Sequence, residues 1–549
     1  MQIESIIKPD LAVQYRQQGF WSDKTLGQHF DGIVKRYSHK KAIIYKDQEL
    51  TYRQLEERVN RVAACLIEAG LQKGDVLSVQ LPNWPEYIYF FYACIKTGIA
   101  FNPIHVPYRK REVEFILRFS DSKAMVIPDQ VSGFDFPAMI QEIWPHLPKL
   151  KQVWVVGDKV PTGMSPATEL LNINKSSPEL ETTLAPQNPD ADAPFLLMYT
   201  SGTEADPKGV VHSHNTIGSL GESITKGLGI SSKEVVYTPS PFSHAMGILL
   251  GPWAAIYWGA QIVIQEAFVP EETLKLIQEH KITFFAGTPS HIVALLQVPN
   301  FSQYQLSSLH TFFTGGASCP VEVVREATRR FGCQVCCLYG MTEGVVTYTR
   351  LDDSPEVASE TVGRPGPGFE INIFDEAGKE VPAGIAGEIV ARGASLFLGY
   401  YRNPQATQET RSPDGWFLTG DLGYIDQDGN LRIVGRKKDM IIRGGKNIYP
   451  IEVEELIYAH PKIVEAALVG MPDHRLGERS CLFVVLKPGE KLTLEEVVEY
   501  LTEKGIAKYK LPERLEVRQE LPMTPSKKIW KRFLRDEIAK ILEKEPPPA

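Results

Sequence analysis

The sequence lacks the features that mark membrane-spanning, secreted and nucleic-acid-binding proteins. No window approaches the roughly 20 uninterrupted apolar residues of a membrane span. Residues 1–5 are not followed by the basic and apolar stretches of a signal peptide. The net charge is −8 over 549 residues, and no basic block precedes the Lys-rich C-terminal stretch. Nucleic acids and anionic membranes require concentrated positive charge, so we expect a cytoplasmic protein that binds neither.

Cysteine is scarce and shows no disulfide pattern. The seven cysteines are an odd number, and most lie in apolar stretches, which is typical of a reduced intracellular protein. Cys333 and Cys336 have metal-ligand spacing but no second ligand pair nearby, so we interpret them as buried strand residues. His212 and His214 also lack Cys or acidic partners, and we expect them to be structural or to lie next to a ligand.

The order of the predicted elements indicates an α/β protein with several parts. Short β-like runs alternate with helical patterns over the first three fifths of the chain, which predicts parallel βαβ units. From about residue 361, short strands and Gly/Pro turns indicate a barrel-like subdomain. We expect an N-terminal domain over 1–435 that combines parallel and mixed sheets with flanking helices and includes this subdomain over about 361–435. A hinge at 436–439 and a small, mobile α+β lid domain over 440–549 complete the prediction.

The expected elements can be given by residue range. Strands are predicted at 42–45, 76–81, 123–128, 152–156, 196–199, 261–265, 282–286, 310–313, 334–338, 465–470, 481–486 and 515–517. Helices are predicted at 52–70, 87–97, 271–280, 290–297, 451–459, 494–505 and 530–543.

A segment rich in Thr, Ser and Gly follows the apolar run 196–199. It reads Thr200-Ser201-Gly202-Thr203-Glu204-Ala205-Asp206-Pro207-Lys208-Gly209. Small residues let backbone N–H groups converge on phosphate oxygens, hydroxyls add donors, and a lysine adds positive charge. The spacing is not that of a Walker loop, because no Gly-Lys-Ser/Thr opens a helix here. We predict a phosphate-binding loop in which the nucleotide contacts are Thr200, Ser201, Gly202, Thr203 and Lys208.

This loop resembles that of the adenylate-forming (AMP-binding) superfamily, which includes acyl-CoA synthetases, adenylation domains and luciferases. Six further segments resemble motifs of the family, and they occur in the expected order along nearly the whole chain. Three of them are the aromatic-His gate Pro241-Phe242-Ser243-His244-Ala245-Met246-Gly247, the adenine-side turn Thr314-Gly315-Gly316-Ala317, and the adenine and magnesium motif Tyr339-Gly340-Met341-Thr342-Glu343. The other three are the ribose motif Trp416-Phe417-Leu418-Thr419-Gly420-Asp421, the interdomain hinge Gly435-Arg436-Lys437-Lys438-Asp439, and the terminal catalytic-lysine loop Pro525-Ser526-Lys527-Lys528-Ile529.

The resemblance implies that ATP and a carboxylic acid form an acyl-adenylate with release of pyrophosphate, and that coenzyme A then accepts the acyl group. Because the α-phosphate and the carboxylate are both anions, this chemistry needs cations and hydrogen-bond donors more than a nucleophilic side chain. The implied catalytic residues are Lys528, His244 and Thr342, and the implied Mg²⁺ ligand is Glu343. The implied contacts to the nucleotide are Gly315, Gly316, Ala317, Tyr339, Gly340, Asp421 and Arg436. The implied contacts to coenzyme A are Arg443, Gly444 and Gly445.

Three positions depart from the pattern of the family. Glu204 and Ala205 stand where the loop usually has Thr-Gly; a carboxylate near phosphates must point outward, and Ala205 does not easily adopt a positive φ. Lys527 stands where a glycine usually precedes the catalytic lysine.

The chemical class of the substrate acid is predicted from residues 235–260, which are expected to line the acyl site and contain no Asp or Glu. An amino acid substrate would need an anion for its ammonium group, because a buried unpaired cation is very costly. The apolar side chains in this stretch therefore favour a medium-chain fatty acid or an alicyclic acid. Residues 339–353 and 505–512 nevertheless resemble aryl-acid-AMP ligases, although Ala245 stands where those enzymes have Asn.

Other readings stay open. A freestanding ligase would load the acid onto the phosphopantetheine of a carrier protein, and a monooxygenase of the luciferase type would share these motifs. A regulator that binds nucleotide without catalysis is disfavoured by Glu343, Asp421 and Lys528. The sequence is compatible with a homodimer.

Overall fold

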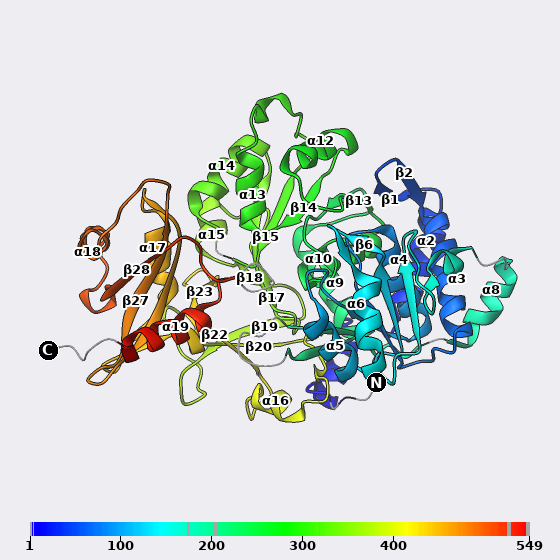
Figure 1. Cartoon of the computed structure of the whole chain (residues 1–549), viewed down its shortest axis with the longest axis horizontal. Coiled ribbons are helices and arrows are strands. Elements are labelled where there is room, and N and C mark those ends of the chain that lie inside the picture. Colours follow the sequence, from blue (N-terminus) through cyan, green and yellow to red (C-terminus); the bar gives the residue numbers. More distant parts are fainter. Residues whose placement is uncertain are drawn as a thin grey trace. The chain divides into compact units, whose positions relative to one another are not determined.

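The structure, a computed structural model of the chain, describes residues 3, 5–172, 176–187, 189–200, 207–317, 319–523 and 529–544. These residues form two compact units (Figure 1). The first unit comprises the described residues within 1–200, 208–370 and 391–416, and the second comprises those within 201–207, 371–390 and 417–549.

One sheet of the first unit has nine strands among the described residues. Its middle strands are parallel neighbours, and antiparallel strands flank them at both edges. The strand order is β18 (Arg364–Pro365), β17 (Val346–Tyr348), β16 (Gln334–Gly340), β15 (Thr311–Gly315), β14 (Phe284–Gly287), β12 (Val235–Tyr237), β13 (Gln261–Ile264), β1 (Lys41–Tyr45) and β2 (Gln48–Thr51).

A second sheet of the same unit has eight described strands. It is parallel except where β10, β11 and β21 pair antiparallel at one edge. The order is β21 (Gly399–Tyr400), β11 (Gly209–Ser213), β10 (Pro194–Tyr199), β4 (Ala100–Pro103), β3 (Val76–Val79), β5 (Ala124–Pro128), β8 (Gln152–Val156) and β9 (Ser165–Pro166); a separate hairpin joins β6 (Gln130–Val131) and β7 (Phe134–Asp135).

The helices of the first unit connect and cover these strands. They are α1 (Pro9–Gln17), α2 (Leu26–Tyr37), α3 (Tyr52–Glu68), α4 (Pro85–Thr97), α5 (Lys110–Phe119), α6 (Phe136–Ile143), α7 (Thr168–Leu171), α8 (Ser177–Leu184), α9 (His214–Leu228), α10 (Ala245–Leu250), α11 (Pro252–Trp258), α12 (Pro270–His280), α13 (Pro289–Leu296), α14 (Val321–Phe331), α15 (Pro355–Glu360) and α16 (Pro404–Glu409), with 3₁₀ turns at Trp144–His146, Ala185–Gln187 and Phe301–Gln303.

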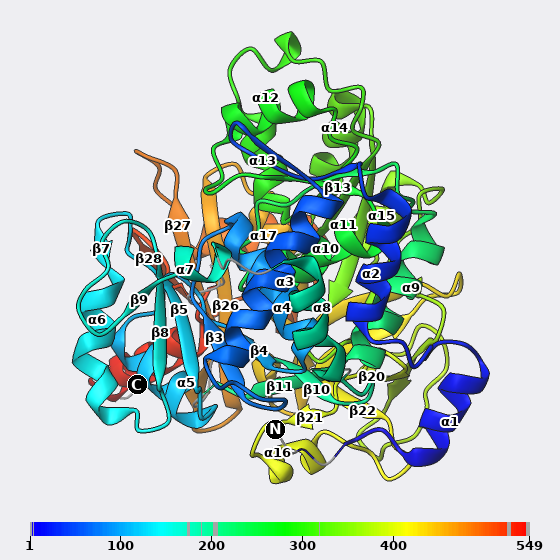
Figure 2. The ribbon, with the colours of Figure 1, turned by 90° about the vertical axis from the view of Figure 1, so that its right-hand side faces the viewer.

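Helices α3 and α4 lie side by side in the main core of the first unit (Figure 2). A capping box between Thr51 and Gln54 starts α3. Helix α4 begins at Pro85, which is well suited to a first helical position, and ends at Gly98 in the left-handed conformation. Residues 87–95 are all buried, and a helix that is apolar on every side belongs in a core.

The predicted elements match the structure where the pattern is strong. The strand predicted at 152–156 is β8, and the helix predicted at 271–280 is α12. Helix α9 was not predicted, because its glycines and β-branched residues lower its helix propensity. Tertiary packing explains those glycines: a Cβ on Gly221 would lie 2.4 Å from the Trp253 ring, and one on Gly227 would lie 1.9 Å from the Tyr348 hydroxyl.

Among its described residues, the second unit contains two sheets. A four-stranded sheet follows the order β19 (Phe369–Phe374), β20 (Gly387–Gly393), β22 (Phe417–Ile425) and β23 (Leu431–Arg436). The 3₁₀ turn η4 (Lys437–Asp439) follows β23. The remaining elements are β24 (Ile441–Arg443), β25 (Lys446–Ile448), α17 (Pro450–Tyr458), β26 (Ile463–Asp473), β27 (Gly477–Leu486), α18 (Leu494–Glu503), a 3₁₀ turn at Lys508–Lys510, β28 (Arg514–Arg518) and α19 (Lys531–Lys544).

Cys333 and Cys336 are buried, as predicted, and burial raises the pKa of each thiol to about 12. Within the part of the chain that the structure describes, no helix combines the length and the apolar character needed to cross a membrane.

Candidate active site

Three of the predicted motifs in the first unit lie at the same end of the parallel strands of the nine-stranded sheet. Strands β12, β14, β15 and β16 are parallel neighbours, so their carboxyl ends meet at the same edge. The gate segment follows β12, the adenine-side turn follows β15, and the segment with Glu343 follows β16. Ligands of open parallel sheets bind at this kind of edge.

His244 lies at the start of α10. Its Nδ1 accepts a hydrogen bond from the backbone N–H of Met246 at 3.3 Å, and its ring lies 6.0 Å from that of His105. A Cβ on Gly247 would be 1.9 Å from the carbonyl oxygen of Pro241. Only glycine therefore lets α10 pack this tightly against the gate.

Two residues that the sequence did not identify form hydrogen bonds with the backbone at the start of the gate segment. The amide of Asn83 donates to the carbonyl of Ser240 at 3.1 Å and accepts from the backbone N–H of Phe242 at 2.8 Å. The hydroxyl of Tyr87 donates to the carbonyl of Phe242 at 2.8 Å. Both residues come from the α4 region, more than 150 positions earlier in the chain, so no local signal reveals the contact.

The adenine-side turn is tightly packed on one side and open on the other. Gly315 is buried, and a Cβ there would lie 2.7 Å from the carbonyl oxygen of Leu338. Gly316 has a φ of +85°, and it is exposed together with Ala317. Gly340, at the end of β16, is also exposed, whereas Tyr339 is 9% exposed. The geometry is compatible with a purine resting against this turn.

The Glu343 segment is a backbone turn that neighbouring residues support. The carbonyl of Thr342 accepts a hydrogen bond from His212 Nε2 at 2.7 Å. Gly344 has a φ of +91°, and a Cβ there would lie 2.0 Å from the carbonyl oxygen of Ser395. The Ser395 hydroxyl donates to the Gly344 carbonyl at 2.8 Å. His212 is therefore structural, as predicted, and it supports a predicted site residue.

The carboxylate of Glu343 is 6% exposed and contacts Tyr400. The Tyr400 hydroxyl donates to Glu343 Oε1 at 2.8 Å, and the Lys208 ammonium lies 4.9 Å from the centre of the Tyr400 ring. Burial raises the pKa of Tyr400, and the negative charge of Glu343 raises it further, so the phenol stays protonated and donates. Tyr400 was not a predicted site residue.

The phosphate loop is described at its two ends. The backbone N–H of Thr200 donates to the carbonyl of Lys208 at 3.0 Å, which continues the pairing of β10 with β11. Four predicted residues, Ser201, Gly202, Thr203 and Lys528, lie outside the described residues, as do Glu204, Ala205 and Lys527.

The residues around Glu343 fit a magnesium ion. Among the described residues, no group of three or more His, Cys, Asp or Glu side chains forms a metal cage. Mg²⁺ does not require one, because it keeps several waters and binds through one or two carboxylates together with substrate phosphates. One buried carboxylate, that of Glu343, together with the phosphates of ATP would be a donor set of this kind.

Asp421 and Arg436 face each other within the second unit. They are paired in the register of β22 and β23, and Arg436 Nε lies 3.0 Å from Asp421 Oδ1. Asp421 is 5% exposed, and its backbone N–H bonds to the Thr419 hydroxyl at 3.1 Å. The ion pair orients the carboxylate that was predicted to bind ribose.

Gly444 and Gly445 form the two-residue turn between β24 and β25, with φ values of +55° and +77°. Glycine is preferred in such a turn because both positions need a positive φ. Arg443, at the end of β24, donates from Nε and from its terminal nitrogen to Glu513, at 3.0 Å each. Lys438, the predicted hinge residue, is exposed in η4.

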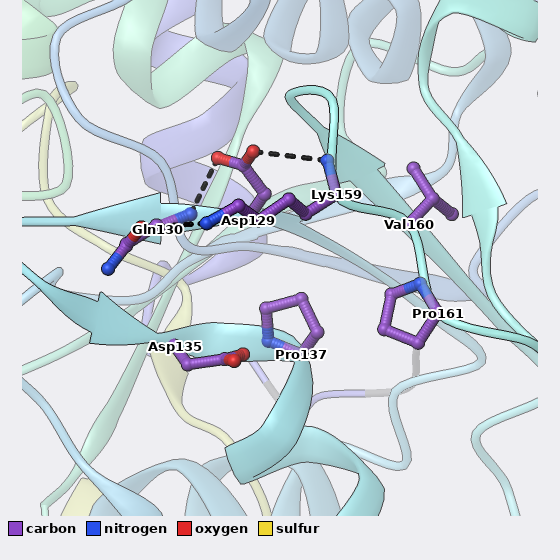
Figure 3. Close-up of a pocket in the computed structure, with 7 residues that line it drawn as sticks. All are labelled: Asp129, Gln130, Asp135, Pro137, Lys159, Val160 and Pro161. Carbon is purple, nitrogen blue, oxygen red and sulfur yellow. Dashed lines mark hydrogen bonds between the residues drawn. The ribbon is translucent and has the colours of Figure 1, made fainter.

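A cavity of about 310 Å³ lies elsewhere in the first unit, and none of the predicted site residues lines it (Figure 3). It is lined by Asp129, Gln130, Asp135, Pro137, Lys159, Val160 and Pro161. The Asp129 carboxylate accepts from the backbone N–H groups of Gln130 and Lys159, at 2.6 and 3.2 Å. The other acidic residue, Asp135, accepts from the backbone N–H of Ala138 at 2.9 Å, so both carboxylates of the cavity bind backbone N–H groups.

The first unit carries the gate, the adenine-side turn and the buried carboxylate of Glu343, and the second unit carries the Asp421–Arg436 pair. This set of features is typical of an adenylate-forming enzyme. The chain belongs to the family of AMP-binding enzymes: the pattern of that family matches residues 30–401, and that of the AMP-binding enzyme C-terminal domain matches residues 452–528. The family predicted from the motifs is therefore confirmed, and curated relatives of the chain include acid–CoA ligases.

Two curated relatives and one solved structure show the range of similarity. The chain is 34% identical to a medium-chain fatty-acid–CoA ligase of Escherichia coli (strain K12), over 97% of this chain and 93% of the relative. It is 31% identical to a 2,3-dihydroxybenzoate-AMP ligase of Bacillus subtilis (strain 168), over 97% of each chain. A crystal structure of an anthranilate CoA ligase in complex with anthranoyl-AMP superimposes with a TM-score of 0.83 at 25% identity, over 95% of this chain and 98% of that one.

Proposed function

We propose that the enzyme activates an apolar carboxylic acid without an amino group, either a medium-chain fatty acid or an alicyclic acid. The observation that carries this proposal is the segment behind His244. Helices α10 and α11 are almost entirely buried, contain no acidic residue, and place Ile248 and Trp253 in the main core. The similarity to a medium-chain fatty-acid–CoA ligase supports the same class of acid.

The acidic residue that directly precedes this stretch in the sequence, Glu234, lies away from the gate. Glu234 immediately precedes β12, at the amino end of a parallel strand, whereas the gate follows the carboxyl end. Its carboxylate is already paired with His310 Nε2 at 2.9 Å and accepts a hydrogen bond from the Thr283 hydroxyl. An ammonium group bound near His244 would find no anion here, and a buried unpaired charge is costly.

In the first half-reaction, a carboxylate oxygen of the acid attacks the α-phosphorus of ATP, and the bond from that phosphorus to the bridging oxygen of pyrophosphate breaks. We assign Lys208 to the polyphosphate and Glu343 to Mg²⁺, which supplies positive charge to the phosphates when it is bound. His244 faces the acid, and Thr342 lies beside Glu343. Lys528 is assigned to the reacting carboxylate and the α-phosphate.

The nucleotide contacts follow from the same assignment. Thr200, Ser201, Gly202 and Thr203 hold phosphate oxygens, and Asp421 with Arg436 holds ribose. The adenine ring rests against the turn formed by Gly315, Gly316, Ala317, Tyr339 and Gly340.

In the second half-reaction, the thiol of coenzyme A attacks the acyl carbon and AMP leaves with the former carboxylate oxygen. We assign Arg443, Gly444 and Gly445 to the pantetheine arm. We further propose that residues 440–549 act as a lid on a domain that spans 1–435, and that residues 436–439 are the hinge. A cytoplasmic location and a homodimer complete the proposal.

A second candidate is an aryl-acid ligase that loads a carrier protein. The similarity to a 2,3-dihydroxybenzoate-AMP ligase, over 97% of both chains, favours it. It differs from the first candidate in both the acid and the acceptor.

Acid-dependent exchange of pyrophosphate into ATP, measured with a panel of acids, tests the first proposal. We expect octanoate or cyclohexanecarboxylate to support exchange better than 2,3-dihydroxybenzoate or any amino acid. Coenzyme A should then yield the thioester. Preferential exchange with the aryl acid, followed by transfer to a phosphopantetheinylated carrier protein and not to coenzyme A, would establish the second candidate instead.

A further inference from the structure

Tyr400 lies on the edge strand β21, beside the strand that follows the phosphate loop. It is paired with Val210 in β11. On either side of this pair, the backbone N–H of Leu398 donates to the Val211 carbonyl at 2.8 Å, and that of Tyr401 donates to the Gly209 carbonyl at 2.7 Å. The backbone of Tyr400 is therefore fixed independently of its side chain.

The side chain of Tyr400 contacts two groups of opposite charge. Its hydroxyl donates to the Glu343 carboxylate at 2.8 Å, and a hydrogen bond to an ionised acceptor is stronger than one between neutral groups. The Lys208 ammonium lies 4.9 Å from the centre of its ring, within the range of a cation–π attraction. One residue therefore contacts both the Glu343 carboxylate and the Lys208 ammonium.

Neighbouring aromatic and backbone groups hold the ring in place. The Phe397 ring packs edge-on against Tyr400 with a centroid distance of 4.9 Å, and the Phe397 backbone N–H donates to the Glu343 carbonyl at 2.9 Å. Tyr400 is 5% exposed. The hydroxyl thus reaches the carboxylate from a ring that has little freedom to move.

We propose that Tyr400 is a positioning residue that orients the Glu343 carboxylate toward magnesium and holds the Lys208 ammonium near the polyphosphate of ATP. This inference rests on the proposed function, which assigns Glu343 to the metal and Lys208 to the phosphates. Replacing a partner that orients a metal ligand typically lowers metal affinity by about 10-fold to 100-fold. In this proposal Tyr400 acts through Glu343 and Lys208 and not on the reacting atoms.

The test measures metal binding without turnover. Mn²⁺ is titrated into the full chain in the presence of a non-hydrolysable ATP analogue, and free Mn²⁺ is followed by electron paramagnetic resonance. Tyr400→Phe removes only the hydroxyl, and we expect the Mn²⁺ dissociation constant to rise by about tenfold or more. Tyr400→Leu also removes the ring beneath Lys208, and we expect it to weaken binding of the ATP analogue without metal, which Tyr400→Phe should leave unchanged.

Tyr52→Phe is the matched control. Tyr52 is a fully buried tyrosine of the same unit, and its hydroxyl donates to the Ala260 carbonyl at 2.5 Å. This variant should bind Mn²⁺ like the parent, because only general packing changes. Equal weakening by Tyr52→Phe and Tyr400→Phe would overturn the positioning role.

The Glu343→Gln variant distinguishes a failure of the role proposed for Tyr400 from a failure of the metal role proposed for Glu343. Unchanged Mn²⁺ affinity in Tyr400→Phe, together with lost affinity in Glu343→Gln, overturns the role of Tyr400 alone. Unchanged affinity in both variants overturns the metal role of Glu343 and, with it, the role of Tyr400. Loss in both, with Tyr52→Phe unaffected, is the result we expect.

Discussion

His212 Nε2 lies 2.7 Å from the carbonyl oxygen of Thr342, the residue that precedes Glu343. A carbonyl oxygen can only accept a hydrogen bond, so Nε2 carries the proton. The other ring nitrogen, Nδ1, lies 3.1 Å from the hydroxyl of Thr216, which can donate to it. The neutral ring therefore bonds at both nitrogens and supports the turn that carries Glu343.

This relationship predicts a loss of stability in mild acid. Burial lowers the pKa of His212 from 6.5 to about 4, and the hydrogen bond to Thr342 only partly offsets this. Below pH 6.5 the unfolded chain binds a proton that the folded chain does not, so stability falls until the pH reaches about 4. The lowered pKa corresponds to about 3 kcal/mol in the free energy of unfolding at the low end of this window. His105 and His214, with pKa values lowered by burial to about 4 and about 3, act in the same direction.

Urea unfolding monitored by tryptophan fluorescence between pH 7.5 and 4.5 measures this effect. We expect His212→Gln to flatten the pH dependence, because its side chain does not titrate in this range. His39→Gln, at an exposed position of the same unit, should keep the dependence of the parent. An unchanged slope in His212→Gln would contradict the assignment of His212 as a buried neutral group.

The ion pair of Asp421 with Arg436 predicts a defect in ATP binding. Arg436 Nε lies 3.0 Å from Asp421 Oδ1, and the pair should present the carboxylate to the ribose hydroxyls. Arg436→Gln removes the charge that orients Asp421, and Asp421→Asn removes the anionic acceptor. Losing a hydrogen bond to a charged group costs about 1.5–3 kcal/mol, so we expect the KM for ATP to rise by roughly 10-fold to 100-fold.

A second ion pair of the same hairpin is the control for this prediction. Arg432 Nε lies 3.3 Å from Asp426 Oδ2, at the turn end of β22 and β23. Arg432→Gln should leave the KM for ATP within about twofold, because this pair does not include the predicted ribose ligand and an ion pair of this kind contributes little to stability. Equal effects of Arg432→Gln and Arg436→Gln would indicate a general disturbance of the hairpin instead of a ribose contact.

Sequence periodicity predicts the fold well where each element buries its own apolar face. The parallel strands and long amphipathic helices of the first unit follow this rule, and β8 occupies the predicted range 152–156. Sequence periodicity does not predict α9, because Gly221 and Gly227 lower its helix propensity. Their absent side chains make room for Trp253 and Tyr348, and such space is a property of tertiary packing that no local pattern contains.

The motifs predict which residues gather at the site, but they do not predict the residues that position them. The Asp421–Arg436 pair follows from the register of one hairpin. Tyr400 meets Glu343 across 57 positions because β21 pairs with β11 at the sheet edge. Strand pairing between distant segments depends on the whole sheet, so only the structure identifies Tyr400.

The turn at Gly444 and Gly445 predicts a separation of the two half-reactions. Gly445 has a φ of +77°, and an alanine there costs about 1–2 kcal/mol in the left-handed region. If this turn contacts pantetheine, Gly445→Ala should lower kcat/KM for coenzyme A by about tenfold and leave pyrophosphate exchange unchanged. Gly429→Ala, in the β22–β23 turn with a φ of +81° and equally open surroundings, is the control. Reduced exchange in Gly445→Ala would place the turn in adenylation instead.

A buried ion pair fixes the start of the last helix in the second unit. Lys531, the first residue of α19, lies 2.7 Å from Glu454 Oε1 on α17. The same carboxylate oxygen accepts from the backbone N–H of Leu468 in β26 at 2.6 Å. Glu454 is 7% exposed, so it joins three elements through a group that water reaches poorly.

Glu454→Gln should therefore destabilise the protein by about 3 kcal/mol, because removing one partner of a buried pair leaves the other charge uncompensated. Glu452→Gln, on the same helix, is the matched control: Glu452 is paired with Lys510 at 2.6 Å, but its side chain is 43% exposed, so we expect a loss of about 1 kcal/mol or less. Chemical denaturation of both variants measures the difference.

Adding Lys531→Met to Glu454→Gln should restore part of the stability, because no unpaired ammonium then stays beside α17. Equal destabilisation by the two Glu→Gln changes, or further loss in the double variant, would contradict the role of the buried pair.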